Sequence, residues 1–216
     1  AVVIIALGCE QDVAQPLAEA AKRHGKPAET GAIQSEGGTV RTTEKAIAIA
    51  RRFADALAAQ PREWCDASEL VLSLKCGGSD YTSGLASNPT LGRVTDRLVA
   101  LGGTAVLGEI AEIMGAEHLL ASRATRPATA TKLIQIITRV ETEARALGLD
   151  IRGTQPSPGN IRGGLTTIEE KSLGATHKGG EVAPLEDVVA YSAPITQKGL
   201  TVMDMPGLDF ESVTGM

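Results

Sequence analysis

Aromatic residues are scarce in this chain, which holds one Trp, two Tyr and two Phe among 216 residues. The core must therefore be built from Val, Ile, Leu and Ala, and platforms for stacking single-stranded nucleic acid are missing. A formal net charge of -5 likewise provides no basic surface for nucleic acid or for an anionic membrane. These absences favour a small molecule as the partner, with no nucleic acid and no membrane.

Long apolar runs and dense cysteines are also lacking. The opening run at 2–7 is too short to span a bilayer, and no basic residue precedes it, so it predicts neither a transmembrane helix nor a signal peptide. Three cysteines, Cys9, Cys65 and Cys76, are too few for a disulfide scaffold. We therefore expect a cytoplasmic protein. The missing initiator Met and the end at Met216 predict a fragment of a longer chain.

Buried-type strands alternate with amphipathic segments along most of the sequence. Strands are expected at 2–7, 69–74, 104–107 and 200–203, and helices at 12–24, 42–59, 88–101, 109–122 with a break near Gly115, and 128–147. This alternation predicts an α/β fold, with a mainly parallel sheet and helices on both faces in a Rossmann-like three-layer arrangement.

The composition of the chain changes after the expected helix at 128–147. Residues 154–180 are rich in Gly, Pro, Ser, Thr and Asn and have little periodicity. A long loop of this kind inside a compact domain is usually functional. We therefore predict a Rossmann-like domain at 1–150 and a loop-rich continuation of the same catalytic region at 151–216, truncated at its C-terminus.

Polar side chains gather where the expected strands end. Cys9 follows the first strand, Cys76 the second, Glu109 and Glu112 the third, and His118 comes shortly after. Ligands of open α/β sheets bind at the carboxyl ends of strands, and thiolate, imidazole and carboxylate together suit iron, manganese or zinc. Simpler interpretations stay open, because a free cysteine is often just a buried small residue and helix carboxylates are often solvated.

A second set of polar groups lies at 156–172, where Asn160, Arg162 and Lys171 could bind the carboxylate and hydroxyls of a small polyhydroxy acid. The alternative is that Thr167 caps a short helix and Glu170 completes a capping box with it. Both interpretations remain open. Lys178 is expected to be an ordinary solvated lysine. Neither a dinucleotide-binding, a P-loop nor a nucleophile-elbow motif occurs in the sequence.

Several long motifs resemble the catalytic region of the altronate and galactarate dehydratase family, which also includes a sulfolactate sulfo-lyase. They are Val3 to Glu10, Leu74 to Asp80, Ala100 to Thr104, Gly115 to Leu120, Pro156 to Asn160 and Gly163 to Ser172. Because such motifs run through nearly the whole chain, the resemblance is specific. Lys75 is a departure, since an acidic residue is common there in relatives.

The resemblance implies a lyase that removes water from a sugar acid such as altronate or galactarate, giving a 2-keto-3-deoxy acid with the help of Fe2+ or Mn2+. It also implies, as partners, N- and C-terminal segments or a small subunit of the same enzyme, and a homodimer is compatible with it. Two alternatives stay open. One is a sulfolactate sulfo-lyase, and the other is a non-catalytic fragment for sugar-acid binding or assembly.

Residue chemistry suggests a role for each of the matched positions. The predicted metal ligands are Cys9, Cys76 and His118; the predicted catalytic residues are Glu112, Glu170 and Lys171, with one of the two glutamates as the base; and the predicted substrate-binding residues are Ser79, Asp80, Asn160, Arg162, Thr166 and Thr167.

Overall fold

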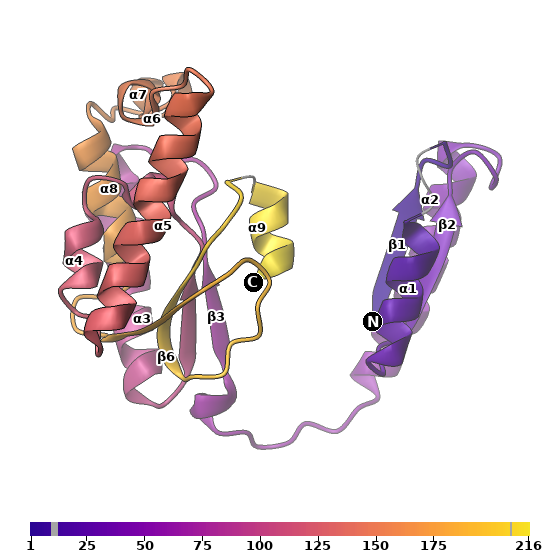
Figure 1. Ribbon diagram of the computed structural model, residues 1–216. Coiled ribbons are helices and arrows are strands. Elements are labelled where there is room, and N and C mark those ends of the chain that lie inside the picture. Colours follow the sequence, from indigo (N-terminus) through magenta and orange to yellow (C-terminus); the bar gives the residue numbers. More distant parts are fainter. Residues whose placement is uncertain (10–12, 208) are drawn as a thin grey trace. The chain divides into compact units, whose positions relative to one another are not determined.

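The computed structural model describes residues 1–9, 13–207 and 209–216, and the chain forms two compact units, Ala1–Trp64 and Cys65–Met216 (Figure 1). Each unit has its own parallel sheet. Residue 150, where the sequence predicted the end of the first domain, lies inside the second unit. Among the described residues, none of the helices is both long and apolar enough to cross a membrane.

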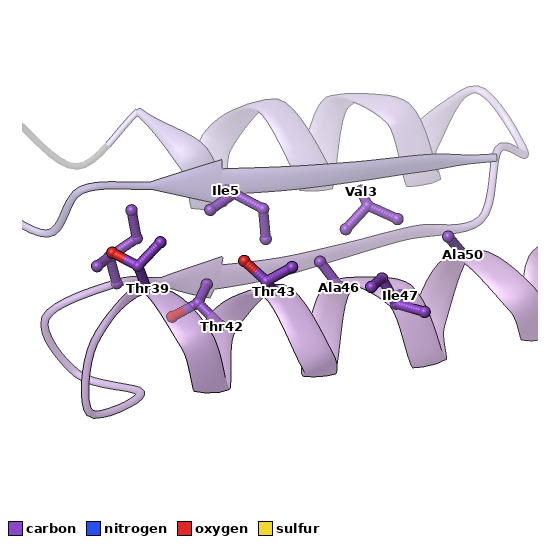
Figure 2. Close-up of a pocket in the computed structure, with 9 residues that line it drawn as sticks. Val3, Ile5, Thr39, Thr42, Thr43, Ala46, Ile47 and Ala50 are labelled. Atoms are coloured by element: carbon purple, nitrogen blue, oxygen red, sulfur yellow. The ribbon is translucent and has the colours of Figure 1, made fainter.

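The first unit is a strand and helix pair repeated once: β1 (Val2–Ala6), α1 (Ala14–Arg23), β2 (Ala28–Ala32) and α2 (Thr39–Ala58). The two strands are parallel, with Val2 opposite Ala28. Val3 and Ile5 of β1 point toward α2, and an apolar groove of about 400 Å³ lies between them (Figure 2). Side chains alternate between the two faces of a strand, so the face of β1 that carries Val3 and Ile5 borders this groove.

The second unit contains the larger sheet and most of the helices. Its elements in chain order are the 3₁₀ turn η1 (Ala67–Glu69), β3 (Val71–Leu74), the π-helical turn η2 (Ser83–Ser87), α3 (Asn88–Ala100), β4 (Thr104–Leu107), the 3₁₀ turn η3 (Ala111–Ile113), α4 (Glu117–Ala121), α5 (Pro127–Ala146), α6 (Ile151–Thr154), α7 (Pro158–Arg162), α8 (Ile168–His177), β5 (Leu185–Val189), β6 (Gly199–Met203) and α9 (Asp209–Gly215).

The sheet of the second unit is parallel throughout, in the order β3-β4-β6-β5. The central strands β4 and β6 are buried along their whole length, whereas β3 lies at an edge and is mostly exposed or half-buried. This explains why the apolar runs at 104–107 and 200–203 identify strands so clearly, because a strand covered on both faces needs no polar positions. The expectation of an α/β fold is confirmed.

The two faces of this sheet are covered unequally. Leu107, Leu200 and Leu185 join the main core, where Val99 of α3, Leu133 of α5 and Ala175 of α8 pack against them. The opposite face carries a small cluster of Val106, Val189, Met203 and Met205, with Met216 packed beside it. Figure 1 accordingly shows α3, α5 and α8 together on one side of the strands. The predicted Rossmann-like three-layer arrangement is not confirmed.

The prediction of a long loop at 154–180 needs correction, because much of this region is helical. Residues 154–180 contain α7 and α8 and follow directly on α6. These helices are short, and α8 is packed on several sides, so no clear amphipathic stripe marks it in the sequence. The strand β5 was also missed, because Glu186 and Asp187 interrupt its apolar run. The break predicted near Gly115 is correct, since η3 ends at Ile113 and α4 begins at Glu117.

Candidate active site

The carboxyl ends of β3 and β4 bring charged side chains together in the second unit. Leu74 and Leu107 are opposite each other in the parallel ladder. The next residues along each strand, Lys75 and Cys76 after β3 and Glu109 after β4, therefore leave the sheet at the same edge. Glu112, one turn further along in η3, reaches the same place.

Lys75, Cys76 and Glu112 form a three-way contact at this edge. The Lys75 ammonium donates a hydrogen bond to Glu112 Oε1 and lies 3.7 Å from Cys76 Sγ. Cys76 Sγ in turn lies 3.8 Å from Glu112 Oε1. The side chains of Lys75 and Glu112 are only 7% and 14% exposed, so this ion pair is shielded from water without being sealed off. Such shielding strengthens the interaction between the charges.

A second ion pair, between Lys178 and Glu109, lies deeper in the unit. Lys178 Nζ donates to Glu109 Oε1 at 2.6 Å, and the two side chains are 3% and 0% exposed. Glu109 Oε2 is buried and has no hydrogen-bond partner among the residues that the structure describes. The backbone carbonyl of Lys178 also accepts a hydrogen bond from the Thr95 hydroxyl of α3. The expectation that Lys178 is solvated is therefore wrong.

Sequence reasoning undervalued this pair for a physical reason. Lys178 follows α8 in a Gly-rich context that is typical of exposed turns, and nothing local to it shows that α8 packs against the end of β4. The signal that could have found its partner was Glu109, a carboxylate only two residues after a strand with no polar face. A charge so near a buried strand usually needs a partner.

The surroundings of these groups alter their protonation. Burial, helped by the charges of Glu109 and Glu112, raises the pKa of the Cys76 thiol to about 11. Burial also raises the pKa of Glu109 against the opposing effect of Lys178. For Lys75, burial opposes the charged form, but the Glu112 carboxylate outweighs it and the pKa is raised. Cys76 is therefore a thiol at neutral pH, and Lys75 is an ammonium ion.

The described residues at this edge do not fit a metal ion. Among the side chains that the structure describes, no group of three or more His, Cys, Asp and Glu is placed to hold one. Lys75, moreover, is hydrogen-bonded to the carboxylate that would serve as the next ligand.

The predicted metal ligands are spread over both units. Cys9 is exposed in the first unit, and Cys76 and the exposed His118 of α4 belong to the second. The neighbouring Glu10, which the sequence also places at the end of β1, lies outside the described residues. The set of Cys9, Cys76 and His118 stays a prediction.

Several of the other predicted residues meet at a hollow of about 190 Å³, which Ser79, Asp80, Glu170 and Lys171 help to line. Asn160 joins them, since its amide donates to the Ser79 carbonyl at 2.8 Å and its oxygen accepts from Lys171 Nζ at 3.0 Å. The structure thus brings together two motifs that are about eighty residues apart, as two halves of one polar surface.

Many of these side chains also hold the backbone in place. Asp80 accepts hydrogen bonds from the Thr82 hydroxyl and from the Ser83 amide, which lower the pKa of its carboxyl group. Asn160 completes a capping box with Ser157 at the start of α7, a feature that the sequence analysis did not identify. Their chemistry therefore serves local structure whether or not they also touch a ligand.

The capping interpretation of Thr167 is confirmed. The Thr167 hydroxyl accepts a hydrogen bond from the Glu170 amide and caps α8. The Glu170 carboxylate accepts hydrogen bonds from the hydroxyl and the amide of Thr166, and these contacts lower the pKa of Glu170. Glu170, Thr166, Thr167 and Arg162 are all exposed.

The apolar groove of the first unit is unsuited to a sugar acid. Its lining side chains are aliphatic or are threonine hydroxyls, including Thr39, Thr42, Ile47 and Ala50 of α2 (Figure 2). Nothing in that lining can neutralise a carboxylate. The charged edge of the second unit is therefore the better candidate for an anionic polar ligand.

Parallel sheets with polar groups gathered at the carboxyl ends of their strands place this chain among the α/β proteins, whose ligands bind at that edge of the sheet. Comparison with known families identifies one family within this class. Residues 67–216 match the model described as D-galactarate/altronate dehydratase, C-terminal. The chain belongs to this family, as its motifs led us to expect.

Individual relatives match nearly the whole chain. The altronate dehydratase of Bacillus subtilis is 36% identical over 96% of this chain and 41% of its own length. The (2R)-sulfolactate sulfo-lyase subunit beta of Chromohalobacter salexigens is 37% identical over 98% and 54%, and the galactarate dehydratase (L-threo-forming) of Escherichia coli is 34% identical over 97% and 41%. The chain therefore spans about half the length of the curated relatives it matches.

Proposed function

We propose that the protein is a carbon-oxygen lyase that removes water from a sugar acid, and that the second unit supplies acid and base groups for this reaction. The family match covers this unit, and relatives named altronate dehydratase and galactarate dehydratase support the substrate class. The observation that carries the proposal is the shielded contact of Lys75, Cys76 and Glu112 at the strand ends.

Dehydration of a 2,3-dihydroxy acid requires two proton transfers. A base takes the proton from the carbon next to the carboxylate, and the hydroxyl on the following carbon leaves as water after it receives a proton. The resulting enol then rearranges to the 2-keto-3-deoxy acid. The site must therefore hold one carboxylate able to accept a proton and one group that is protonated at neutral pH.

Glu112 and Cys76 meet these two requirements side by side. Glu112 is the better base candidate of the two predicted glutamates, because it lies at the shielded strand ends whereas Glu170 is exposed and bonded to Thr166. The Cys76 thiol carries a proton at neutral pH and lies beside Glu112, and we assign to it the protonation of the leaving hydroxyl. Lys75 supplies a positive charge for the developing enediolate. The metal that the resemblance implies enters none of these steps.

The residues around the neighbouring hollow are proposed to bind the rest of the substrate. Lys171 and Asn160 offer an ammonium and an amide, and Ser79 and Asp80 offer oxygen acceptors for sugar hydroxyls. A polyhydroxy acid needs both kinds of partner. Thr166, Thr167 and Arg162 are exposed near this surface and are proposed as outer contacts.

Sulfolactate sulfo-lyase activity is the second candidate. It is favoured by the Chromohalobacter salexigens relative, because this chain covers 54% of that protein's length and only 41% of the length of the altronate dehydratase of Bacillus subtilis. The elimination begins in the same way, but sulfite leaves without needing a proton. A proton donor such as Cys76 is therefore dispensable for sulfite loss and important for loss of water.

The test is an assay of the full-length protein with altronate, galactarate and sulfolactate, detecting 2-keto acid. Glu112→Gln should lower kcat by about 10²- to 10⁴-fold, the usual value of a positioned base. Glu143→Gln is the matched control, because Glu143 is 60% exposed on α5 and pairs with Arg139 of the same helix. Cys76→Ser should slow loss of water more than loss of sulfite.

Two results would contradict the proposal. One is the absence of keto acid from every substrate, which would favour the alternative of a sugar-acid-binding or assembly fragment. The other is Glu112→Gln turnover equal to that of Glu143→Gln, which would remove Glu112 from the reaction while leaving the family membership intact.

A further inference from the structure

Two lysines carry positive charge at the charged edge of the second unit. Glu112 accepts a hydrogen bond from Lys75, and Glu109 accepts one from Lys178. Each of these two carboxylates is therefore paired with an ammonium group. An ammonium group beside a carboxylate repels a second cation and so weakens the attraction of that carboxylate for a divalent ion.

The position between Cys76 and Glu112 nevertheless has the dimensions of a metal position. A sulfur and a carboxylate oxygen 3.8 Å apart can contact one ion at about 2.3 and 2.1 Å respectively, the bond lengths of zinc sites. The Lys75 ammonium contacts both of these atoms. It thus stands where a shared cation would stand, and two cations cannot occupy this place together because of their mutual repulsion.

We propose that the ammonium group of Lys75 takes the place of a divalent cation at the carboxyl end of β3, so that Cys76 and Glu112 are arranged around a lysine. The side chains come from two neighbouring strand ends, and both Lys75 and Glu112 are largely buried. The inference goes beyond the proposed lyase reaction, because it concerns which cation is bound at this position.

Removing the ammonium should uncover a metal site. In Lys75→Met the thiol and the carboxylate keep their positions but lose their cation, and a soft divalent ion can then displace the thiol proton and bind both. Co2+ is the probe, because a bound thiolate produces a charge-transfer absorption band that oxygen or imidazole ligands do not produce.

The experiment titrates the full chain with Co2+ alone and follows this band. Lys75→Met should bind Co2+ at least tenfold more tightly than the wild type, and Lys75→Met combined with Cys76→Ser should lose the gain. The Cys76→Ser partner also subtracts any signal from the exposed Cys9 and Cys65. Lys75→Arg, which retains a cation, and Lys132→Met, at an exposed position of α5, should both behave like the wild type.

The inference is overturned if Lys75→Met binds Co2+ no more tightly than the wild type, whether both proteins bind the ion through Cys76 or neither does. Circular dichroism establishes that each variant is folded, and Lys75→Gln, which keeps a polar side chain of similar reach, replaces Lys75→Met if that variant unfolds. Turnover is not measured, so failure here leaves the lyase proposal untouched.

Discussion

Lys178 and Glu109 are 69 residues apart in the chain, yet the lysine ammonium donates to the carboxylate at 2.6 Å in the interior of the second unit. The contact joins the end of α8 to the end of β4. Removing one partner of a buried ion pair leaves an uncompensated charge, which typically costs about 3–5 kcal/mol. The pair is therefore a sensitive point of the fold.

Lys178→Met should accordingly lower the free energy of unfolding by about 3–5 kcal/mol, measured by urea denaturation with circular dichroism. Trp64 is fully exposed in the first unit, so its fluorescence is a poor reporter for the second. The double variant Lys178→Met with Glu109→Leu should recover much of the loss, because no charge remains buried. Equal destabilisation by the single and double variants would contradict this account.

The same variant should show a distinctive dependence on pH. Burial raises the pKa of Glu109 in the folded state, and loss of Lys178 removes an opposing charge and raises it further. A folded pKa above the unfolded one means that stability is greatest at low pH and falls as pH rises through the folded pKa. Lys178→Met should therefore lose less stability at pH 5 than at pH 8, by urea denaturation at both pH values.

Cys76 should react slowly with iodoacetamide. Its pKa of about 11 leaves little thiolate at neutral pH, so the alkylation rate should rise about tenfold per pH unit without a plateau up to about pH 10. Mass spectrometry of a Cys9→Ser, Cys65→Ser variant measures this rate for Cys76 alone. Glu112→Gln removes a charge that raises the pKa of Cys76 and should therefore speed its alkylation. An alkylation rate that reaches a plateau near pH 9 would contradict the raised pKa.

Gly92→Ala should destabilise the contact between α3 and α8. A Cβ atom at Gly92 would lie 2.1 Å from the His177 carbonyl oxygen, which belongs to rigid helix backbone. Overpacking of this kind costs about 1–3 kcal/mol or more, seen as a lower urea midpoint. Gly77→Ala is the control, because its Cβ would meet nothing within 4 Å, and it should change the midpoint little.

Lys171→Ala should reduce kcat/KM of the full-length enzyme by about ten- to a hundredfold, the effect of losing a charged hydrogen bond of about 1.5–3 kcal/mol. Lys171 also donates to Gln155 Oε1 at 2.6 Å and to Asn160 Oδ1 at 3.0 Å, so thermal unfolding must accompany the kinetics. Unchanged kinetics in a folded variant would limit Lys171 to holding α8 against the segment before α7.

Thr167→Ala should cost about 1 kcal/mol of stability through loss of the α8 cap, whereas Thr167→Ser, which keeps the hydroxyl, should cost little. The comparison isolates the hydrogen bond from the Glu170 amide at 3.2 Å. If both variants unfold at the wild-type midpoint, the cap contributes nothing measurable.

The α/β class, the strands of the second sheet other than β5, and the family could all be predicted from the amino-acid sequence. The runs at 104–107 and 200–203 are apolar at nearly every position because β4 and β6 are covered on both faces. Patterns of this kind are local, so they can be identified without knowing what the strands pack against. The cap at Thr167 could be predicted as one of two alternatives for the same reason, since its partner is three residues away.

The pairing of side chains that are distant in the sequence became clear only from the tertiary structure. Lys178 was expected in solvent and is buried against Glu109, and the polar residues expected in a loop at 156–172 instead cap and join short helices. Lys75 was considered only as a departure from relatives, and it proves to contact both Cys76 and Glu112. Such contacts depend on which elements the fold places side by side, and the free energy of a charge depends on its burial and partners, neither of which local sequence contains.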